Sequence, residues 1–369
     1  MKAQAAIAYR GDDQFRIEEI SVDDVRDDEI LVKIAGVGLC HTDLVFKSMM
    51  ADFPLPAVLG HEGSGVVLSV GRNITNVKPG DHVIITFRSC GACDRCGSGL
   101  PSYCRSMPKL NYTGRREDGS AAYERNGEDI SSNFFGQSSF SELAITYERN
   151  VVKVDDDLPL EIMGPLGCGV QTGAGAIMRS LEAQPASSVL ITGGGSVGLS
   201  AVMGAAICEC STIVLVEPHA ARRELALDFG ATHVIDPGEA PDLASALAVI
   251  APAGFDKALD TSGAPTVQEA ALACLAPKGV LGLVGISPPQ TRLPGEVNKV
   301  MTFGHTVMGI IEGDSDPDVF LPELVVHFKA GRLPFDRMVK TYPLSQINEA
   351  VAQQHAGECI KAVLIPGLK

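Results

Sequence analysis

Four cysteines crowd into one short segment of this 369-residue chain. Cys90, Cys93, Cys96 and Cys104 follow the spacing C-x2-C-x2-C-x7-C. Four thiolates in a tetrahedral arrangement suit a zinc ion and leave it no open position, so the pattern predicts a structural zinc site. A redox-active loop and an iron–sulfur cluster are the alternatives, although nothing else in the chain indicates electron transfer.

A second chemical pattern is built from glycines. Gly193, Gly195 and Gly198 form G-x-G-x-x-G directly after the apolar run 189–192, and a helical segment begins at Val197. These glycines permit a tight turn, a close approach of backbone to a pyrophosphate and close packing of helix on strand. The helix N-terminus adds N–H groups that attract phosphate. The pattern therefore predicts a dinucleotide site.

An acid at the end of the next apolar run separates the two nicotinamide dinucleotides. Glu217 follows Gly198 by about twenty residues, the spacing at which an acid reaches the adenosine ribose. A carboxylate there accepts hydrogen bonds from the ribose hydroxyls and repels a 2′-phosphate, which favours NAD over NADP. Arg222 and Arg223 lie close by and could reach a 2′-phosphate, so NADP stays the alternative.

Three further motifs carry thiols or imidazoles in unusual surroundings. They are Cys40-His41-Thr42-Asp43, Gly60-His61-Glu62, and Cys168 within GPLGCGVQTG. A single Cys or His is usually structural, and spacing alone does not assign these residues a shared role.

The elements that must position these residues change in character near residue 160. Before it, β-branched runs such as 30–40, 63–71 and 80–87 alternate with turns and predict a β-rich part with loops. After it, apolar runs alternate with helical stretches, which indicates a parallel sheet covered on both faces. Beyond about 310 the alternation stops, and one helix (321–333) and a last strand (362–367) are expected.

The composition excludes several kinds of partner. The formal charge is −15, so nucleic acid and anionic membrane surfaces are repelled on average. No apolar run reaches the length of a membrane span, and the N-terminus does not resemble a signal peptide.

We expect a cytoplasmic, reducing location, where a tight cysteine cluster favours metal over disulfides. The other four cysteines should be small buried hydrophobes; they are Cys208, Cys210, Cys274 and Cys359.

Over nearly its whole length the chain resembles the zinc-containing alcohol dehydrogenases of the medium-chain dehydrogenase/reductase superfamily. The matching motifs, in family order, are GLCHTD, PAVLGHEGSGVV, VKPGDHVI, CGACDRCGSGLPSYC, GCGVQTG, ITGGGSVGLSAV and GATHVID. The loops and the stretch MGIIEGDSDP are most similar to the aryl (benzyl-type) and allylic alcohol dehydrogenases. The resemblance implies an α/β fold. It further implies that residues 1–165 form a GroES-like catalytic domain, that 166–310 form a Rossmann doubly wound NAD-binding domain, and that 311–369 return to the catalytic domain.

The resemblance also implies two zinc ions per subunit. Cys40, His61 and Cys168 correspond to the ligands of a catalytic zinc with an open fourth position, and the four-cysteine segment holds the structural zinc. Glu62 corresponds to the acid beside the metal, and Asp43 to the carboxylate that holds the ligand histidine through its other ring nitrogen.

Further roles follow from the same resemblance. Thr42 corresponds to the hydroxyl residue that contacts the substrate oxygen, while Thr172 and Val197 pack near the nicotinamide. His41 and Lys361 match positions that face the coenzyme pyrophosphate.

The substrate pocket is expected in a cleft between the two domains. By motif correspondence its apolar lining consists of Phe87, Phe135, Ile286 and Ile311, while the neighbouring Glu312 could face solvent instead. An apolar, partly aromatic lining suits a flat unsaturated or aryl group, whereas a polyol needs more polar partners.

One position departs from the family pattern. Many members carry a histidine five residues after the first zinc ligand, where it ends a proton relay to solvent. Here that position is Val45, so a relay must stop at Thr42 and the nicotinamide ribose or pass to water or another base.

The resulting hypothesis is an NAD-linked zinc enzyme that reversibly oxidises a primary aryl or allylic alcohol to its aldehyde. A glutathione-dependent formaldehyde dehydrogenase, a polyol dehydrogenase and a non-catalytic NAD- or zinc-binding protein are the alternatives. The resemblance further implies a homodimer or homotetramer that joins its nucleotide domains edge to edge, with 279–286 as the expected outer strand.

Overall fold

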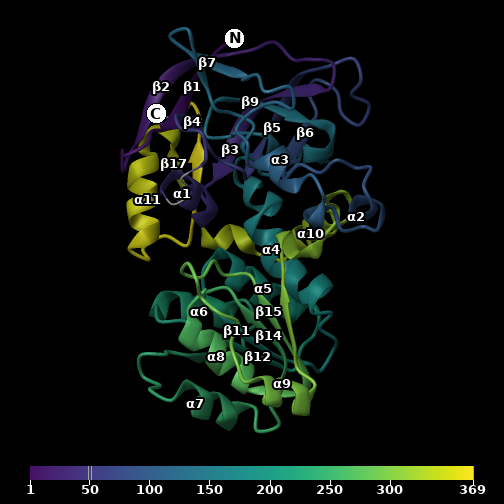
Figure 1. Ribbon diagram of the computed structural model, residues 1–369, viewed down its shortest axis with the longest axis vertical. Helices are drawn as coiled ribbons and strands as arrows, with labels where there is room; N and C mark the ends of the chain where they lie inside the picture. The colour runs from purple at the N-terminus through teal and green to yellow at the C-terminus, as the bar shows by residue number, and fades with distance from the viewer. Residues whose placement is uncertain (49, 51, 369) are drawn as a thin grey trace. The chain divides into compact units, whose positions relative to one another are not determined.

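The computed structural model describes residues 1–48, 50 and 52–368 (Figure 1). The chain folds as two compact units. The first unit comprises Met1–Cys168, Asp316–Glu323 and Asp336–Lys369, and the second comprises Gly169–Ser315 and Leu324–Phe335. The chain thus leaves the first unit a few residues after the predicted boundary at 165 and returns to it a few residues after 310.

The first unit is built from two sheets whose strands pair mainly antiparallel. The smaller sheet has the order β4 (Ala57–Val58), β1 (Lys2–Ala8), β2 (Phe15–Val22), β7 (Tyr123–Arg125) and β8 (Glu128–Ile130). The larger has the order β10 (Val151–Val154), β6 (His82–Ile85), β5 (Gly63–Val70), β3 (Glu29–Gly38), β18 (Lys361–Ile365) and β17 (Val339–Pro343), with β9 (Leu143–Tyr147) also paired to β3. Inward-facing aliphatic and aromatic side chains of both sheets form one apolar core.

Strand β3 is the central element of this unit. It pairs with β5, β9 and β18, and this accounts for its nearly continuous burial. Its register with β5 shifts between Ile34 and Gly36, where a Cβ on Gly36 would lie 1.8 Å from the carbonyl oxygen of Glu161. The strand ends at Gly38, so it delivers Cys40 to the edge of the core.

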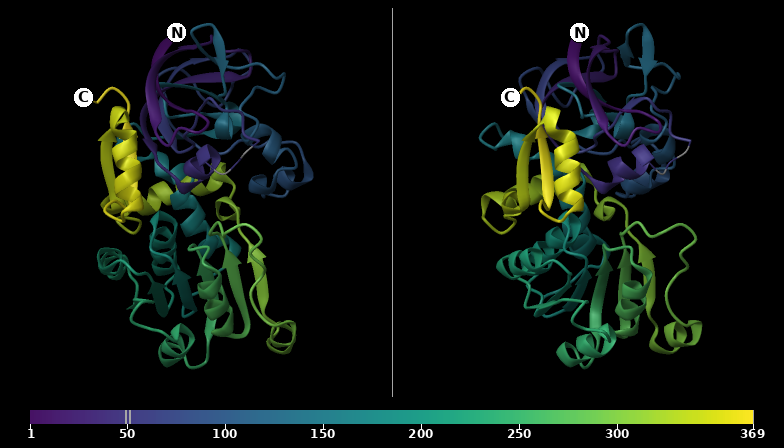
Figure 2. Two further views of the ribbon diagram at one scale, coloured as in Figure 1. Left: turned by 60° about the vertical axis from the view of Figure 1, so that its left-hand side comes forward. Right: turned by 90° about the vertical axis from the view of Figure 1, so that its left-hand side faces the viewer.

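The helices of the first unit are short, and the sequence pattern did not predict those before residue 160. They are α1 (His41–Ser48), α2 (Asp94–Gly97), α3 (Met107–Asn111) and, near the C-terminus, α11 (Ile347–His355). Figure 2 shows α11 in yellow beside β17 and β18. Helix α10 (Pro317–Lys329) has residues in both units and matches the helix expected after 310.

The second unit is a parallel sheet, as the alternating pattern predicts (Figure 2). Its strand order is β13 (His233–Ile235), β12 (Thr212–Val216), β11 (Ser188–Thr192), β14 (Phe255–Asp260), β15 (Leu275–Leu283) and β16 (Thr306–Gly309). The strand order reverses between β11 and β14, the point at which doubly wound sheets bind dinucleotides. Its helices are α4 (Gly169–Gly175), α5 (Ser196–Ile207), α6 (Ala220–Asp228), α7 (Leu243–Ile250), α8 (Pro265–Ala273) and α9 (Val297–Phe303).

The outer strand of this sheet is not the one expected. The stretch 279–286 lies largely in β15, which pairs with β14 on one side and β16 on the other. The edge strand is β16, which the sequence pattern does not reveal because Thr306–Gly309 is only four residues long and ends in glycine.

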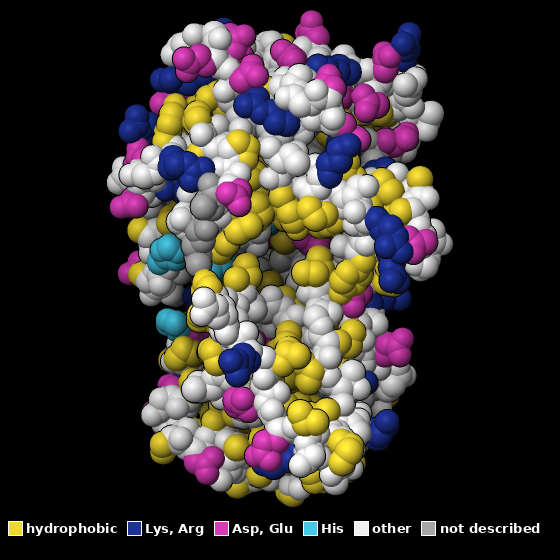
Figure 3. Space-filling model, in the orientation of Figure 1, with side chains coloured by type: hydrophobic (Ala, Val, Ile, Leu, Met, Phe, Trp, Pro, Cys, Tyr) yellow, Lys and Arg dark blue, Asp and Glu magenta, His cyan; other side chains and the backbone are white. Residues whose placement is uncertain are grey.

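The surface carries charges of both signs. On the face shown in Figure 3, Lys and Arg side chains alternate with Asp and Glu. Among the described residues, no helix is long and apolar enough to cross a membrane.

A buried ion pair in the first unit yields a test of the fold. The Arg116 guanidinium donates to Glu29 at 2.7 and 3.1 Å and to Asp23 at 2.7 Å, and its side chain is 3% exposed. Replacing Arg116 by Met leaves Glu29 as an uncompensated buried charge, so the free energy of unfolding should fall by about 3–5 kcal/mol in a urea titration. The exposed pair Arg72–Asp27 provides the control, because Arg72→Met should hardly change the free energy of unfolding. Equal effects of the two substitutions would contradict this account.

Candidate functional site

The carboxylate of Asp43 organises the backbone between two predicted metal ligands. It is buried in the first turn of α1. Its Oδ2 accepts the backbone N–H of Cys40 at 3.0 Å. Its Oδ1 accepts the N–H of Gly60 at 3.1 Å and lies 2.8 Å from Nδ1 of His61. One side chain therefore fixes the start of α1 and the orientation of the His61 ring, and the latter is the contact that the resemblance implies for Asp43.

Four side chains that can bind a metal converge beside Asp43. Their ligand atoms all lie within 4.8 Å of one another, and the residues are Cys40, His61, Glu62 and Cys168. The Nε2 atom of His61 is buried and makes no hydrogen bond within the described part of the chain. Two sulfurs and a ring nitrogen that faces them form a donor set that zinc prefers, so the residues present fit a zinc ion.

The electrostatics of this cluster favour metal binding. A hydrogen bond with Cys168 is the main reason why the pKa of the Cys40 thiol lies well below its usual value. Burial opposes the charged form of His61, but Asp43 outweighs it and raises the pKa of the imidazole well above its usual value. The arrangement thus stabilises the Cys40 thiolate beside the positively charged imidazole of His61. A divalent cation can take the place of the imidazole proton and supply the same positive charge.

Glu62 is the fourth member of the cluster and is paired with a lysine. Lys361 donates to Glu62 Oε1 at 2.7 Å and to the carbonyl oxygen of Leu39 at 3.2 Å. Burial raises the pKa of Glu62 to about 7, although Lys361 acts in the opposite direction. Gly38 leaves the space for this carboxylate, since a Cβ there would lie 1.9 Å from Glu62 Oε2. Lys361 is itself 2% exposed, and its predicted contact with the coenzyme stays a prediction.

An aromatic side chain stacks on the candidate ligand His61. The ring of Phe135 lies 4.5 Å from the imidazole, centroid to centroid, at an interplanar angle of 24°. Phe135 has a φ of +50°, and Asn133, Gly136 and Ser138 are also left-handed. Such backbone strain persists only where the surroundings hold it, and it is concentrated at functional sites.

Gln137 connects this strained segment to the ligand segment. Its Nε2 donates to the carbonyl oxygens of His61 at 2.9 Å and Thr86 at 3.2 Å, and its Oε1 accepts the N–H of Gly63 at 3.0 Å. Further aromatic rings extend the apolar surface around Phe135. Tyr112 and Phe134 contact its ring at 5.4 and 4.9 Å between centroids.

The remaining predicted residues of the first unit lie near α1 or in the core. Thr42 is half-buried and His41 exposed at the start of α1, while Val45 is buried on the same helix. Phe87 and Phe135 are 2% and 4% exposed and both belong to the apolar core, and their part in a substrate pocket stays a prediction.

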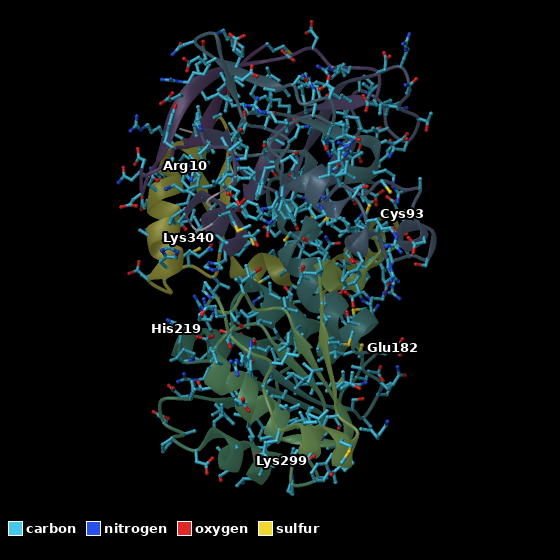
Figure 4. The ribbon with its side chains drawn as sticks, in the orientation of Figure 1. Arg10, Cys93, Glu182, His219, Lys299 and Lys340 are labelled. Carbon is cyan, nitrogen blue, oxygen red and sulfur yellow. The ribbon has the colours of Figure 1, made fainter. Side chains whose placement is uncertain are left out.

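The four-cysteine segment forms a second cluster on the loop that carries α2, where Figure 4 labels Cys93. Sulfur–sulfur distances are 3.6 Å for Cys93–Cys96, 3.9 Å for Cys90–Cys96 and 4.0 Å for Cys93–Cys104. A tetrahedron with Zn–S bonds of about 2.3 Å has edges of about 3.8 Å, so these positions fit one ion. An iron–sulfur cluster with several irons would hold the four sulfurs further apart than this. The pKa of the Cys93 thiol is lowered to about 6, mainly by a hydrogen bond from the backbone N–H of Arg105, which favours the thiolate that binds metal.

The glycine motif forms a turn with an open face. Gly193 has a φ of +92°, and a Cβ on Gly198 would lie 1.8 Å from the Gly193 carbonyl oxygen. By contrast, a Cβ on Gly195 would meet no atom within 4 Å, so backbone is accessible there. Ser196 begins α5, and its buried hydroxyl has no hydrogen-bond partner among the described residues. An accessible loop with a free hydroxyl at a helix N-terminus fits the pyrophosphate of a dinucleotide.

Glu217 lies beside this turn and is buried. Its Oε2 accepts the N–H of Gly194 at 2.6 Å, and its Oε1 lies 2.5 Å from Nδ1 of His219, which Figure 4 labels. Arg223 is occupied elsewhere, because it pairs with Asp236 at 2.8 Å. Arg222 is the cation that remains near Glu217, at 4.0 Å.

The other predicted residues of the second unit have varied surroundings. Thr172 is buried on α4, and Val197 on α5 is half-buried. Ile286 and Ile311 are 52% and 47% exposed, and their part in a substrate pocket stays a prediction.

Three polar residues at these sites were not predicted from the sequence. The hydroxyl of Ser196 could have been found, because it directly follows the second glycine of the motif. Gln137 carries no sequence signal, since its partners are distant in the chain. The buried position of Glu312, which accepts a hydrogen bond from Gln171, is likewise visible only in the fold.

Comparison with known proteins agrees with this geometry. The alcohol dehydrogenase GroES-like domain matches residues 26–156, and the zinc-binding dehydrogenase family matches residues 196–325. The chain is similar to the geraniol dehydrogenase of Castellaniella defragrans, with 45% identity over 99% of this chain and 98% of that protein.

Two solved structures resemble the chain over their full lengths. One is an alcohol dehydrogenase zinc-binding domain protein from Burkholderia ambifaria, with a TM-score of 0.96, 43% identity and 99% of each chain covered. The other is the benzyl alcohol dehydrogenase of Acinetobacter calcoaceticus, with a TM-score of 0.95, 38% identity and 100% of each chain covered. The chain therefore belongs to the zinc-dependent alcohol dehydrogenases of the medium-chain dehydrogenase/reductase superfamily.

The two clusters can be distinguished by metal content. We predict two zinc ions in the purified chain by elemental analysis, and one in Cys93→Ser, which removes a thiolate from the four-cysteine loop. The variant should also unfold at a lower temperature, because metal binding contributes to the stability of such loops. Two tightly bound ions in the variant would contradict the assignment of this loop.

Proposed function

We propose that the chain oxidises primary aryl or allylic alcohols to aldehydes, reversibly, with NAD as hydride acceptor. The observation that carries this proposal is the convergence of Cys40, His61 and Cys168 next to the ring of Phe135. It combines three ligands, which leave a tetrahedral metal one further position, with aromatic rings that contact one of those ligands.

In this proposal, Cys40, His61 and Cys168 hold the catalytic zinc. When bound, the zinc supplies Lewis acidity that makes an alcohol hydroxyl more acidic, and the nicotinamide ring supplies the hydride acceptor. Asp43 keeps the His61 ring in the tautomer that presents Nε2 to the cluster. Glu62 stays beside the ligands and is held there by Lys361.

The proton of the alcohol leaves by way of Thr42 in this proposal. Thr42 lies two residues after Cys40 on α1 and is half-buried, so its hydroxyl can accept a proton near the cluster and pass it outward. Val45 lies three residues further along the helix and is buried, and it has no group that can carry a proton. Val45 therefore cannot continue a proton path from Thr42 to solvent.

The substrate class is inferred from the aromatic rings around His61. Phe134 and Phe135 are both buried and contact the imidazole at 5.6 and 4.5 Å between centroids. Aromatic pairs gain about 0.5–1.5 kcal/mol beyond the burial of area, which favours an aryl or allylic group over a saturated one. The similar proteins that act on geraniol and benzyl alcohol fit this inference.

NAD is favoured over NADP by the surroundings of Glu217. Its carboxylate lies at the glycine turn, where it would accept ribose hydroxyls and repel a 2′-phosphate. Of the two arginines considered from the sequence, Arg223 is engaged by Asp236. Of these two arginines, only Arg222 is left to bind a 2′-phosphate and so to favour NADP.

Assembly and location complete the proposal. A homodimer or homotetramer, joined through the second unit, has an open edge available at β16. None of the ten cysteines is in a disulfide, which fits a reducing compartment, and we propose the cytoplasm.

Replacing one ligand tests the metal assignment. Cys40→Ser should lower kcat for benzyl alcohol at least about 1000-fold, because the Lewis acid contributes several kcal/mol to the barrier. The variant should keep its fold by circular dichroism and its binding of NAD, since Gly193–Gly198 lie in the other unit. Substantial turnover by a variant shown to lack the second zinc would refute the assignment.

A substrate panel tests the alcohol and the coenzyme together. Steady-state kcat/KM for benzyl alcohol, geraniol, ethanol, sorbitol and S-hydroxymethylglutathione should be highest for the first two, and higher with NAD than with NADP.

Phe135→Ala should lower kcat/KM for benzyl alcohol about 10- to 100-fold and for ethanol only slightly, because ethanol has no ring to contact the ring of Phe135. A preference for sorbitol would contradict the apolar site.

A further inference from the structure

A buried carboxylate in the second unit has no part in the roles assigned above. Glu312 is 8% exposed, and its Oε2 accepts a hydrogen bond from Gln171 Nε2 at 3.1 Å. The hydroxyl of Thr172 donates to the same oxygen at 3.4 Å. Both partners lie on α4, so the sequence-based alternative of a solvent-facing Glu312 is wrong.

The backbone holds this carboxylate in place. Glu312, Gly313 and Asp314 are all left-handed, with φ values of +52°, +64° and +50°. The turn packs directly on α4, because a Cβ on Gly313 would lie 2.5 Å from the carbonyl oxygen of Gln171 and 2.8 Å from Cα of Gly175. Glu312 is a non-glycine residue with a long side chain in this conformation, which is strained, and such strain is concentrated at functional sites.

The topology of the sheet places Glu312 on one half of the dinucleotide site. It comes three residues after the carboxyl end of β16, in the half formed by β14, β15 and β16. Glu217 directly follows β12 in the other half, where the proposed function puts the adenosine ribose. A dinucleotide that straddles the reversal between β11 and β14 puts its second nucleoside over the half that carries Glu312.

The nicotinamide ring is positively charged in NAD⁺ and neutral in NADH. A buried carboxylate attracts the charged form, and its effect in the protein interior is on the order of tenfold in affinity. We propose that Glu312 is a specificity-determining residue that raises the affinity for the oxidised coenzyme relative to the reduced one. This inference rests on the proposed use of a nicotinamide dinucleotide.

The test is the ratio of two dissociation constants in the zinc-loaded full chain. Binding of NADH is followed by its fluorescence, and NAD⁺ is measured by competition against it. Glu312→Gln keeps the shape of the side chain and removes its charge, so Kd(NAD⁺)/Kd(NADH) should rise about tenfold. A purely structural role would weaken both coenzymes together and leave the ratio unchanged.

Two matched variants control for charge and for position. Glu312→Asp keeps the charge and suits a left-handed residue, so its ratio should stay near that of the wild type. Glu209→Gln removes an exposed carboxylate just beyond the C-terminal end of α5, and it should also leave the ratio unchanged. If Glu312→Gln does not fold, Glu312→Asn removes the charge in a residue that tolerates the same backbone, and the same rise is expected.

The outcomes separate this inference from the function on which it rests. An unchanged ratio in a neutral variant that binds both coenzymes would overturn the role of Glu312 and leave the proposed function standing. A wild-type chain that binds neither form would overturn the proposed function and this inference with it.

Discussion

The geometry of the metal cluster depends on one buried carboxylate. Asp43 accepts the N–H groups of Cys40 and Gly60 and contacts the ring of His61, so it joins two segments that are 18 residues apart. Without it, burial would favour a neutral imidazole that is free to rotate. With it, Nε2 is directed at the two cysteine sulfurs, and the protein has a metal-binding geometry before any metal arrives.

Both candidate sites also require backbone that carries no side chain. Gly38 leaves the volume that Glu62 occupies, and Gly198 lets α5 contact the turn at Gly193. In each case a single added Cβ would lie within 2 Å of an oxygen atom. Close packing of backbone, more than the number of ligands, therefore determines how near the functional groups approach one another.

The local features of this protein were predictable from sequence, and the long-range ones were not. The alternation of apolar runs with helices gave the parallel sheet, and the spacings of cysteine and glycine gave the two compact motifs. The pairing of Lys361 with Glu62 spans 299 residues and depends on β18 lying beside β3. Likewise, β16 and the buried position of Glu312 result from packing that no periodicity in those short segments reveals.

The central claim is that two separate clusters each bind one zinc ion, and that one of them has an open position. Anomalous diffraction at the zinc edge from crystals of the purified chain tests it most directly. We predict two peaks, one bonded to all four sulfurs of Cys90, Cys93, Cys96 and Cys104, and one bonded to Cys40, His61 and Cys168 with a non-protein ligand. A single peak at the four-cysteine loop, or four protein ligands at both sites, would contradict this account.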